Sequence, residues 1–82
     1  MKIGYSRQAQ KSLIRFPSNK QIQLINKISL LKSNPFVGKK LKGEWQGFYS
    51  LRIWPYRILY GLDKKKNLIK IHKVEHRQGV YN

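Results

Sequence analysis

Acidic residues are almost absent from this chain. Three Asp and Glu stand against eighteen Lys and Arg in 82 residues, which gives a formal net charge of +15. Such a chain repels itself, and the repulsion costs folding stability unless an anionic partner neutralises it. Nucleic acid is the favoured partner, because each phosphate that a cation neutralises releases condensed counterions. A merely soluble basic protein and a protein bound to a membrane surface are the alternatives.

Cysteine and long apolar runs are also missing. Without cysteine the chain forms no disulfide and no thiolate metal site. No apolar run approaches the roughly 20 residues that span a bilayer, and the N-terminal MKIGYSRQ lacks the apolar stretch of a secretory signal. Both tryptophans lie outside the helical segments, which disfavours a membrane-surface helix. We therefore expect a cytoplasmic protein that binds no membrane.

The spacing of the apolar residues predicts one small domain that spans residues 1–82. Its elements are a strand, two helices and three further strands, at residues 2–5, 7–15, 20–32, 48–53, 56–62 and 67–74. Ser6 is expected to cap the first helix, and Ser18 or Asn19 the second. Short loops between the last three strands favour antiparallel pairing. The expected fold class is α+β, with the N-terminal strand and the helical hairpin packed on a small antiparallel β-sheet (β-α-α-β-β-β).

Side chains alternate across a strand, so the sequence also predicts which residues share a face. If Trp54 and Pro55 form a two-residue turn, Arg52 pairs with Arg57 on the face opposite the core. The core then takes apolar residues of the second helix and the strands, namely Ile22, Leu24, Ile25, Ile28, Leu31, Tyr49, Leu51, Ile53, Tyr56, Ile58, Tyr60, Ile69 and Ile71. Strict alternation puts Lys70, His72 and Val74 on the Arg face.

Arg52 and Arg57 are the first candidates for a functional site. Like charges directly opposite each other in a sheet are destabilising. A bound phosphate reverses that effect, because Arg binds it through two parallel hydrogen bonds. The alternative is that both side chains extend into water without a ligand.

The chain has none of the residue spacings typical of metal sites or Gly-rich phosphate loops, so we expect no metal and no cofactor. Its Arg, Lys, His and Tyr suit metal-free RNA cleavage, in which the ribose 2′-OH attacks the adjacent phosphorus. Arg52 and Arg57 are the candidates to stabilise the developing charge, and His76 to transfer a proton. Tyr81 or Trp54 is the candidate to stack on a base. His72 is expected to be a surface or partly buried residue.

Four segments of the second half carry a family resemblance. They are KLKG at 40–43, FYSLR at 48–52, YRILY at 56–60 and VEHRQGVY at 74–81. Taken together they resemble the RelE/ParE toxin superfamily over the C-terminal half, whereas the N-terminal helices match it in pattern alone. The resemblance implies a toxin that enters the 30S A site of the ribosome and cuts mRNA. It also implies a cognate acidic antitoxin that holds the toxin inactive.

The resemblance implies roles for individual residues as well. Arg57 would stabilise transition-state charge, Tyr81 would orient or activate the substrate, and His76 would act in proton transfer. We expect the Lys-rich loop and the ends of the strands to bind RNA, through Lys39, Lys40, Lys42, Arg77 and Trp54.

One departure from the family concerns the general base. RelE members carry Lys at the strand positions that are Phe48 and Ser50 in this chain, so Lys40, Lys42 or His76 is expected to take over that role. ParE members inhibit DNA gyrase instead, and they usually lack the H-R-x-x-V-Y ending that residues 76–81 match. This ending favours the nuclease. An inactive relative that persists as an RNA-binding module is a third possibility.

Overall fold

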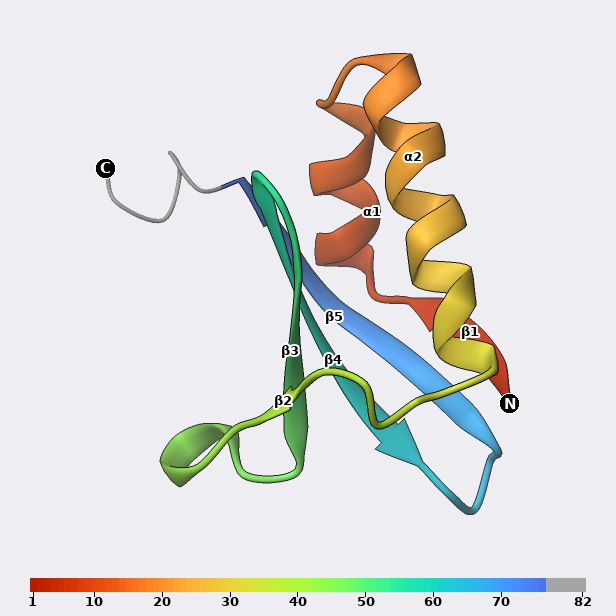
Figure 1. Ribbon diagram of the computed structural model, residues 1–82, viewed down its shortest axis with the longest axis vertical. Helices are drawn as coiled ribbons and strands as arrows, with labels where there is room; N and C mark the ends of the chain where they lie inside the picture. The colour runs from red at the N-terminus through yellow and green to blue at the C-terminus, as the bar shows by residue number, and fades with distance from the viewer. Residues whose placement is uncertain (77–82) are drawn as a thin grey trace.

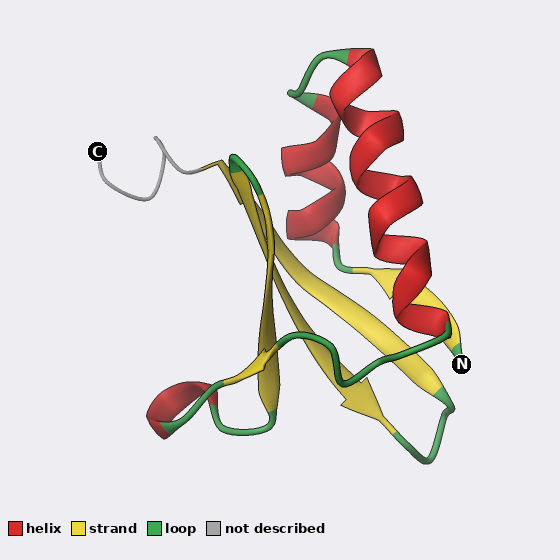
Figure 2. Ribbon diagram, viewed as in Figure 1, coloured by secondary structure: helices red, strands yellow, loops and turns green. Residues whose placement is uncertain are grey.

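The structure, a computed structural model, describes residues 1–76, in which two helices cover one face of a five-stranded sheet (Figures 1 and 2). The elements are β1 (Lys2–Tyr5), α1 (Arg7–Ile14), α2 (Ser18–Ser29), the 3₁₀ turn η1 (Leu30–Lys32), β2 (Lys39–Lys40), the 3₁₀ turn η2 (Gly43–Trp45), β3 (Phe48–Ile53), β4 (Tyr56–Asp63) and β5 (Leu68–His76). This confirms the α+β class. No helix within residues 1–76 has the length and apolar character needed to cross a membrane.

The sheet has the strand order β1-β5-β4-β3-β2. The antiparallel meander β3–β4–β5 is confirmed, including the pairing of Arg52 with Arg57. β1, however, lies parallel to β5, so the sheet is mixed rather than wholly antiparallel. Most of the chain separates these two strands, and therefore no short loop dictates their relative direction. The additional strand β2 consists of Lys39 and Lys40, which are weak strand formers and gave no signal in the sequence.

The predicted cap of α1 is confirmed. Ser6 Oγ accepts a hydrogen bond from the Ala9 N–H at 3.0 Å and donates one to the His72 carbonyl oxygen at 2.7 Å. One bond satisfies a free N–H of the first helical turn, and the other fastens that turn to β5. The cap therefore fixes α1 against the sheet.

α2 begins earlier than expected, because Pro17 rather than Ser18 or Asn19 occupies the cap position. Ile22 and Ile25, which were expected in the core, are 61% and 45% exposed. A helix turns once every 3.6 residues, so a single stripe of α2 faces the sheet. The core between the helices and the sheet consists of Ala9, Leu13, Leu24, Ile28, Leu31, Tyr56, Ile58, Tyr60, Ile69, Ile71 and Val74.

A β-bulge in β5 changes the facing of that strand's second half. Tyr60 pairs with Ile71, but Leu59 pairs with Lys73, which leaves His72 as the extra residue. Each inserted residue moves the side chains after it to the opposite face. Val74 is therefore buried in the core, and its expected place on the Arg face was wrong. The same bulge places the next residue, Glu75, on the Arg face.

Tyr60 ties the sheet to the loop that leads into β2. Its buried hydroxyl donates a hydrogen bond to the Pro35 carbonyl oxygen at 2.8 Å and accepts one from the Gly38 N–H at 3.0 Å. Burial raises the pKa of Tyr60 above the ordinary tyrosine value of 10.0, against a smaller lowering by the Gly38 hydrogen bond. The hydroxyl therefore stays protonated at neutral pH and can keep donating. A Cβ on Gly38 would lie 2.6 Å from this hydroxyl, so the position requires glycine.

We expect Tyr60→Phe to lower the free energy of unfolding by about 1–3 kcal/mol, because the partly buried Pro35 and Gly38 backbone groups lose their partner. Urea denaturation followed by circular dichroism measures this change. Tyr49→Phe is the matched control, since Tyr49 stacks on Tyr60 at 5.4 Å and its hydroxyl makes no hydrogen bond within residues 1–76. Equal losses in the two variants would contradict the role given to the Tyr60 hydroxyl.

Candidate nucleic-acid interface

The open face of the sheet, which is the face turned away from α1 and α2, carries most of the candidate residues. Side chains that pair directly across neighbouring strands share a face. The pairing therefore arranges the open face in three rows, which are Arg52–Arg57–Glu75, Lys39–Ser50–Leu59–Lys73 and Phe48–Gly61–Lys70. Five Lys and Arg side chains stand against one carboxylate in these rows. The open face is thus a basic surface with Arg at one end and an aromatic residue at the other.

Arg52 and Arg57 lie side by side, as the two-residue turn predicted. Both side chains are exposed, and both project from backbone that is held in a regular ladder. The turn between them is Trp54–Pro55, whose peptide bond is cis. Two guanidinium groups on neighbouring strands can therefore present their donors to one anion.

The other predicted RNA-binding residues divide between several places. Lys39 pairs with Ser50 and shares the open face, whereas Lys40 pairs with Tyr49 and lies on the opposite side of β2. Lys42 is exposed in the loop before η2, and Trp54 is 61% exposed at the β3–β4 turn. Arg77 and Tyr81 lie outside the described residues.

His76 is not brought to the face that holds Arg57. It pairs with Tyr56, and the two rings meet edge to face with their centroids 5.1 Å apart. Arg57 pairs instead with Glu75, so Glu75 is the titratable neighbour of the arginines on the open face. Glu75 could not be predicted at this position, because nothing in the residue pattern indicates the bulge that turns it toward the open face.

A cluster of rings at the other end of the open face was also missed. Trp45, from η2, meets Phe48 with centroids 5.5 Å apart and His72 at the same distance. Phe48 and His72 are 5.6 Å apart, and Lys73 Nζ lies 5.4 Å from the centroid of the Trp45 ring. One of the two positions where RelE members carry Lys thus belongs to an aromatic cluster in this chain.

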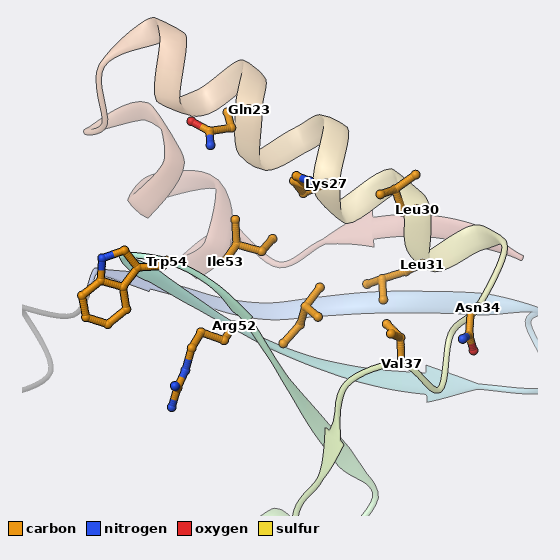
Figure 3. A pocket seen from close by; sticks show the side chains of 10 residues that line it. Gln23, Lys27, Leu30, Leu31, Asn34, Val37, Arg52, Ile53 and Trp54 are labelled. Atoms are coloured by element: carbon orange, nitrogen blue, oxygen red, sulfur yellow. The ribbon is translucent and has the colours of Figure 1, made fainter.

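A groove runs between the end of α2 and β3, and it reaches the edge of the open face (Figure 3). Its volume is about 510 Å³, and its lining includes Lys27, Leu30, Val37, Arg52, Ile53 and Trp54. Leu30 and Val37 are 61% and 56% exposed, so the groove presents apolar side chains to a possible partner. Figure 3 shows Ile53 pointing toward the helices and Arg52 away from them, so the groove borders both faces of β3.

Residues 3–81 match the model of a family described as "ParE toxin of type II toxin-antitoxin system, parDE". The chain belongs to this ParE toxin family. That membership confirms the RelE/ParE superfamily to which the four sequence segments pointed. The solved structures described next share the order of this chain's helices and strands.

Individual relatives agree with the family. Toxin RelG of Mycobacterium tuberculosis is 40% identical over 45 residues, which cover 55% of this chain and 52%, about half, of that protein. The toxin–antitoxin complex RelBE2 of the same organism matches with a TM-score of 0.85 at 28% identity, over 93% of this chain and 96% of that one. The archaeal RelE–RelB complex of Pyrococcus horikoshii matches with a TM-score of 0.77 at 25% identity, over 93% of each chain.

Proposed function

We propose that the protein is a ribosome-dependent mRNA endonuclease, the toxin of a toxin–antitoxin pair. mRNA in the 30S A site would lie on the open face, which implies action in the cytoplasm. The observation that carries this proposal is the exposed pair Arg52–Arg57 at the end of a sheet face with five cations and one carboxylate. Such a surface binds a phosphate backbone, and its paired guanidinium groups suit one phosphate in particular.

The proposed chemistry is metal-free. The ribose 2′-OH loses its proton to a general base and attacks the adjacent phosphorus, and the 5′ oxygen leaves with a proton from a general acid, so that a 2′,3′-cyclic phosphate remains. Arg57 and Arg52 stabilise the negative charge on the phosphorane oxygens. Tyr81 orients the substrate, and His76 takes part in proton transfer. Lys39, Lys40, Lys42, Arg77 and Trp54 hold the RNA.

Gyrase inhibition is the alternative, because the matching family is described by the name ParE. Induced expression of the chain, with transcript ends mapped by primer extension, tests the first function, and a gyrase supercoiling assay with purified protein tests the second. We expect cleaved transcripts and unchanged supercoiling. Intact transcripts with inhibited supercoiling would instead establish the gyrase function. Activity in neither assay would point to an inactive binding module.

We also propose that the cognate antitoxin has an acidic segment that occupies the groove of Figure 3 with apolar side chains and covers the open face with carboxylates. Several similar solved structures are complexes of a toxin with its antitoxin. Lys27 and Arg52 flank the apolar floor of the groove, so an amphipathic acidic segment matches it in charge and in polarity. Carboxylates on Arg52 would also block the proposed RNA site.

We expect Leu30→Glu to weaken antitoxin binding at least about tenfold. Burying a leucine side chain contributes about 1.5–3 kcal/mol, and each 1.4 kcal/mol is about a factor of ten in affinity. Titration calorimetry with the acidic protein encoded beside the toxin measures the affinity. Ile22→Glu is the matched control, since Ile22 is also 61% exposed on α2 and does not line the groove. Equal affinity of both variants would place the antitoxin elsewhere.

A further inference from the structure

We propose that Trp45, Phe48 and His72 form a nucleobase platform, which holds one base of single-stranded RNA while the phosphates lie on the neighbouring lysines. This inference rests on the proposed function, in which RNA lies on the open face, and it adds a site for a base to that surface. Neither Trp45 nor His72 was assigned a part in RNA binding by the sequence. The platform is built from three separate segments of the chain, namely η2, β3 and the bulge of β5.

The rings form a closed set of contacts. The three pairs of centroids are 5.5, 5.5 and 5.6 Å apart, and the planes of Trp45 and Phe48 meet at 85°. Edge-to-face packing of this kind is favourable for aromatic rings and fixes their relative orientation. All three side chains are half-buried, so part of each remains accessible to a ligand. A base that stacks there meets rings already held in place.

The fold makes room for the platform at two points. A Cβ on Gly61 would lie 3.2 Å from the Phe48 ring, so glycine in the middle of β4 lets that ring rest on the sheet. The bulge in β5 directs both His72 and Lys73 to the open face, whereas regular alternation would separate them. Bulges commonly re-aim side chains beside functional sites.

The charges around the rings favour RNA as the ligand. Lys73 lies over the Trp45 ring, Lys70 pairs with Gly61 beside Phe48, and Lys39 is in the next row. Aromatic rings interleaved with cations are the arrangement by which proteins bind single strands, with bases on the rings and phosphates on the lysines. Phe48 lies four residues before Arg52 on β3, about 13 Å along the strand. A strand held at the platform can therefore extend toward the arginine pair.

A purely structural role for the cluster makes a different prediction. Trp45 would then only fasten the loop around η2, whose Gly43 and Gly47 have positive φ angles of 69° and 92°. In that case its loss changes stability and leaves the preference for bases unchanged. Affinities for two RNA probes that share one sugar–phosphate backbone, one with bases and one without, therefore distinguish the two roles.

The test is fluorescence anisotropy at low salt with two labelled probes, a six-nucleotide 2′-O-methyl RNA that resists cleavage and the same backbone with abasic positions. We expect Trp45→Leu to lower the affinity for the base-carrying probe by roughly 5- to 150-fold, the range that corresponds to one stacked base. Binding of the abasic probe and its salt dependence should not change, because the phosphate contacts remain. Trp45→Tyr keeps a ring and should retain most of the affinity. Phe36→Leu is the control, since Phe36 is exposed and contacts Tyr49, on the other face of β3.

Several results would overturn the platform. One is equal weakening of both probes by Trp45→Leu, and another is no weakening of either. Failure of the wild-type protein to bind the base-carrying probe more tightly than the abasic one would do the same. The proposed nuclease function is judged separately, by cleavage on programmed ribosomes, so it can stand when the platform falls. If Trp45→Leu does not fold, His72→Leu is measured with the same two probes and the same criteria.

Discussion

Arg57→Ala is expected to slow mRNA cleavage about 10²- to 10³-fold, which is the usual effect of removing one preorganised charge donor from a transition state. The side chain is exposed on the open face, so its removal leaves no cavity in the core. The variant should therefore keep the wild-type circular dichroism spectrum and melting temperature. Single-turnover cleavage on programmed ribosomes measures the rate of the chemical step.

Two companion variants sharpen this experiment. Arg7→Ala removes the same charge from an exposed position at the start of α1, and we expect it to cleave at the wild-type rate. Arg57→Lys keeps the charge but loses the planar fork, so it should recover only part of the rate. An Arg57→Ala protein that cleaves as fast as the wild type would remove Arg57 from the mechanism.

The position of Arg57 could be predicted because it depends only on local features of the sequence. Alternating apolar residues set the facing of β3 and β4, and a two-residue turn fixed their register. Arg52 and Arg57 then had to be neighbours on the face opposite the core. Neither the facing nor the register depends on distant parts of the chain, and the structure has the predicted pairing of Arg52 with Arg57.

The end of β5 could not be predicted, because the bulge at His72 leaves no trace in the residue pattern. One extra residue reversed the facing of everything after it, which buried Val74 and gave Glu75 to the open face. The positions of β1 and Trp45 could not be predicted either, because they depend on contacts with β5, which is distant in the sequence. β1 pairs with β5 in parallel, and Trp45 contacts His72 of β5. The apolar spacing of α2 also did not determine which of its isoleucines contact the sheet. Ile22 and Ile25 were therefore wrongly expected in the core and are exposed.

The second large effect is expected for proton transfer, because its candidate residues Glu75 and His76 both follow the bulge in β5. The resemblance of residues 74–81 to the family predicts that His76 transfers a proton, and general acid–base catalysis is typically worth about 10²–10⁴ in rate. We expect His76→Gln to lower single-turnover cleavage at least about tenfold. Tyr81→Phe should lower it as well.

The geometry supplies a sharp competitor for that role. The His76 ring packs against Tyr56, while Glu75 shares the open face with Arg57. A carboxylate beside two guanidinium groups can accept the proton of a 2′-OH whose phosphate those groups hold. Glu75→Gln and His76→Gln should therefore be compared on the same ribosomes, with His72→Gln as a histidine that the proposal places in binding rather than in proton transfer.

The pH dependence separates the three residues. If His76 transfers the proton, His76→Gln changes how the cleavage rate depends on pH, and Glu75→Gln leaves the shape of that profile intact. His72→Gln should weaken binding without changing that shape, since a platform residue moves no proton. If Glu75→Gln lowers the cleavage rate at every pH and His76→Gln cleaves at the normal rate, the general base is the Glu75 carboxylate. The bulge at His72 would then be the feature that completes the site, because it alone brings Glu75 to the face of the arginines.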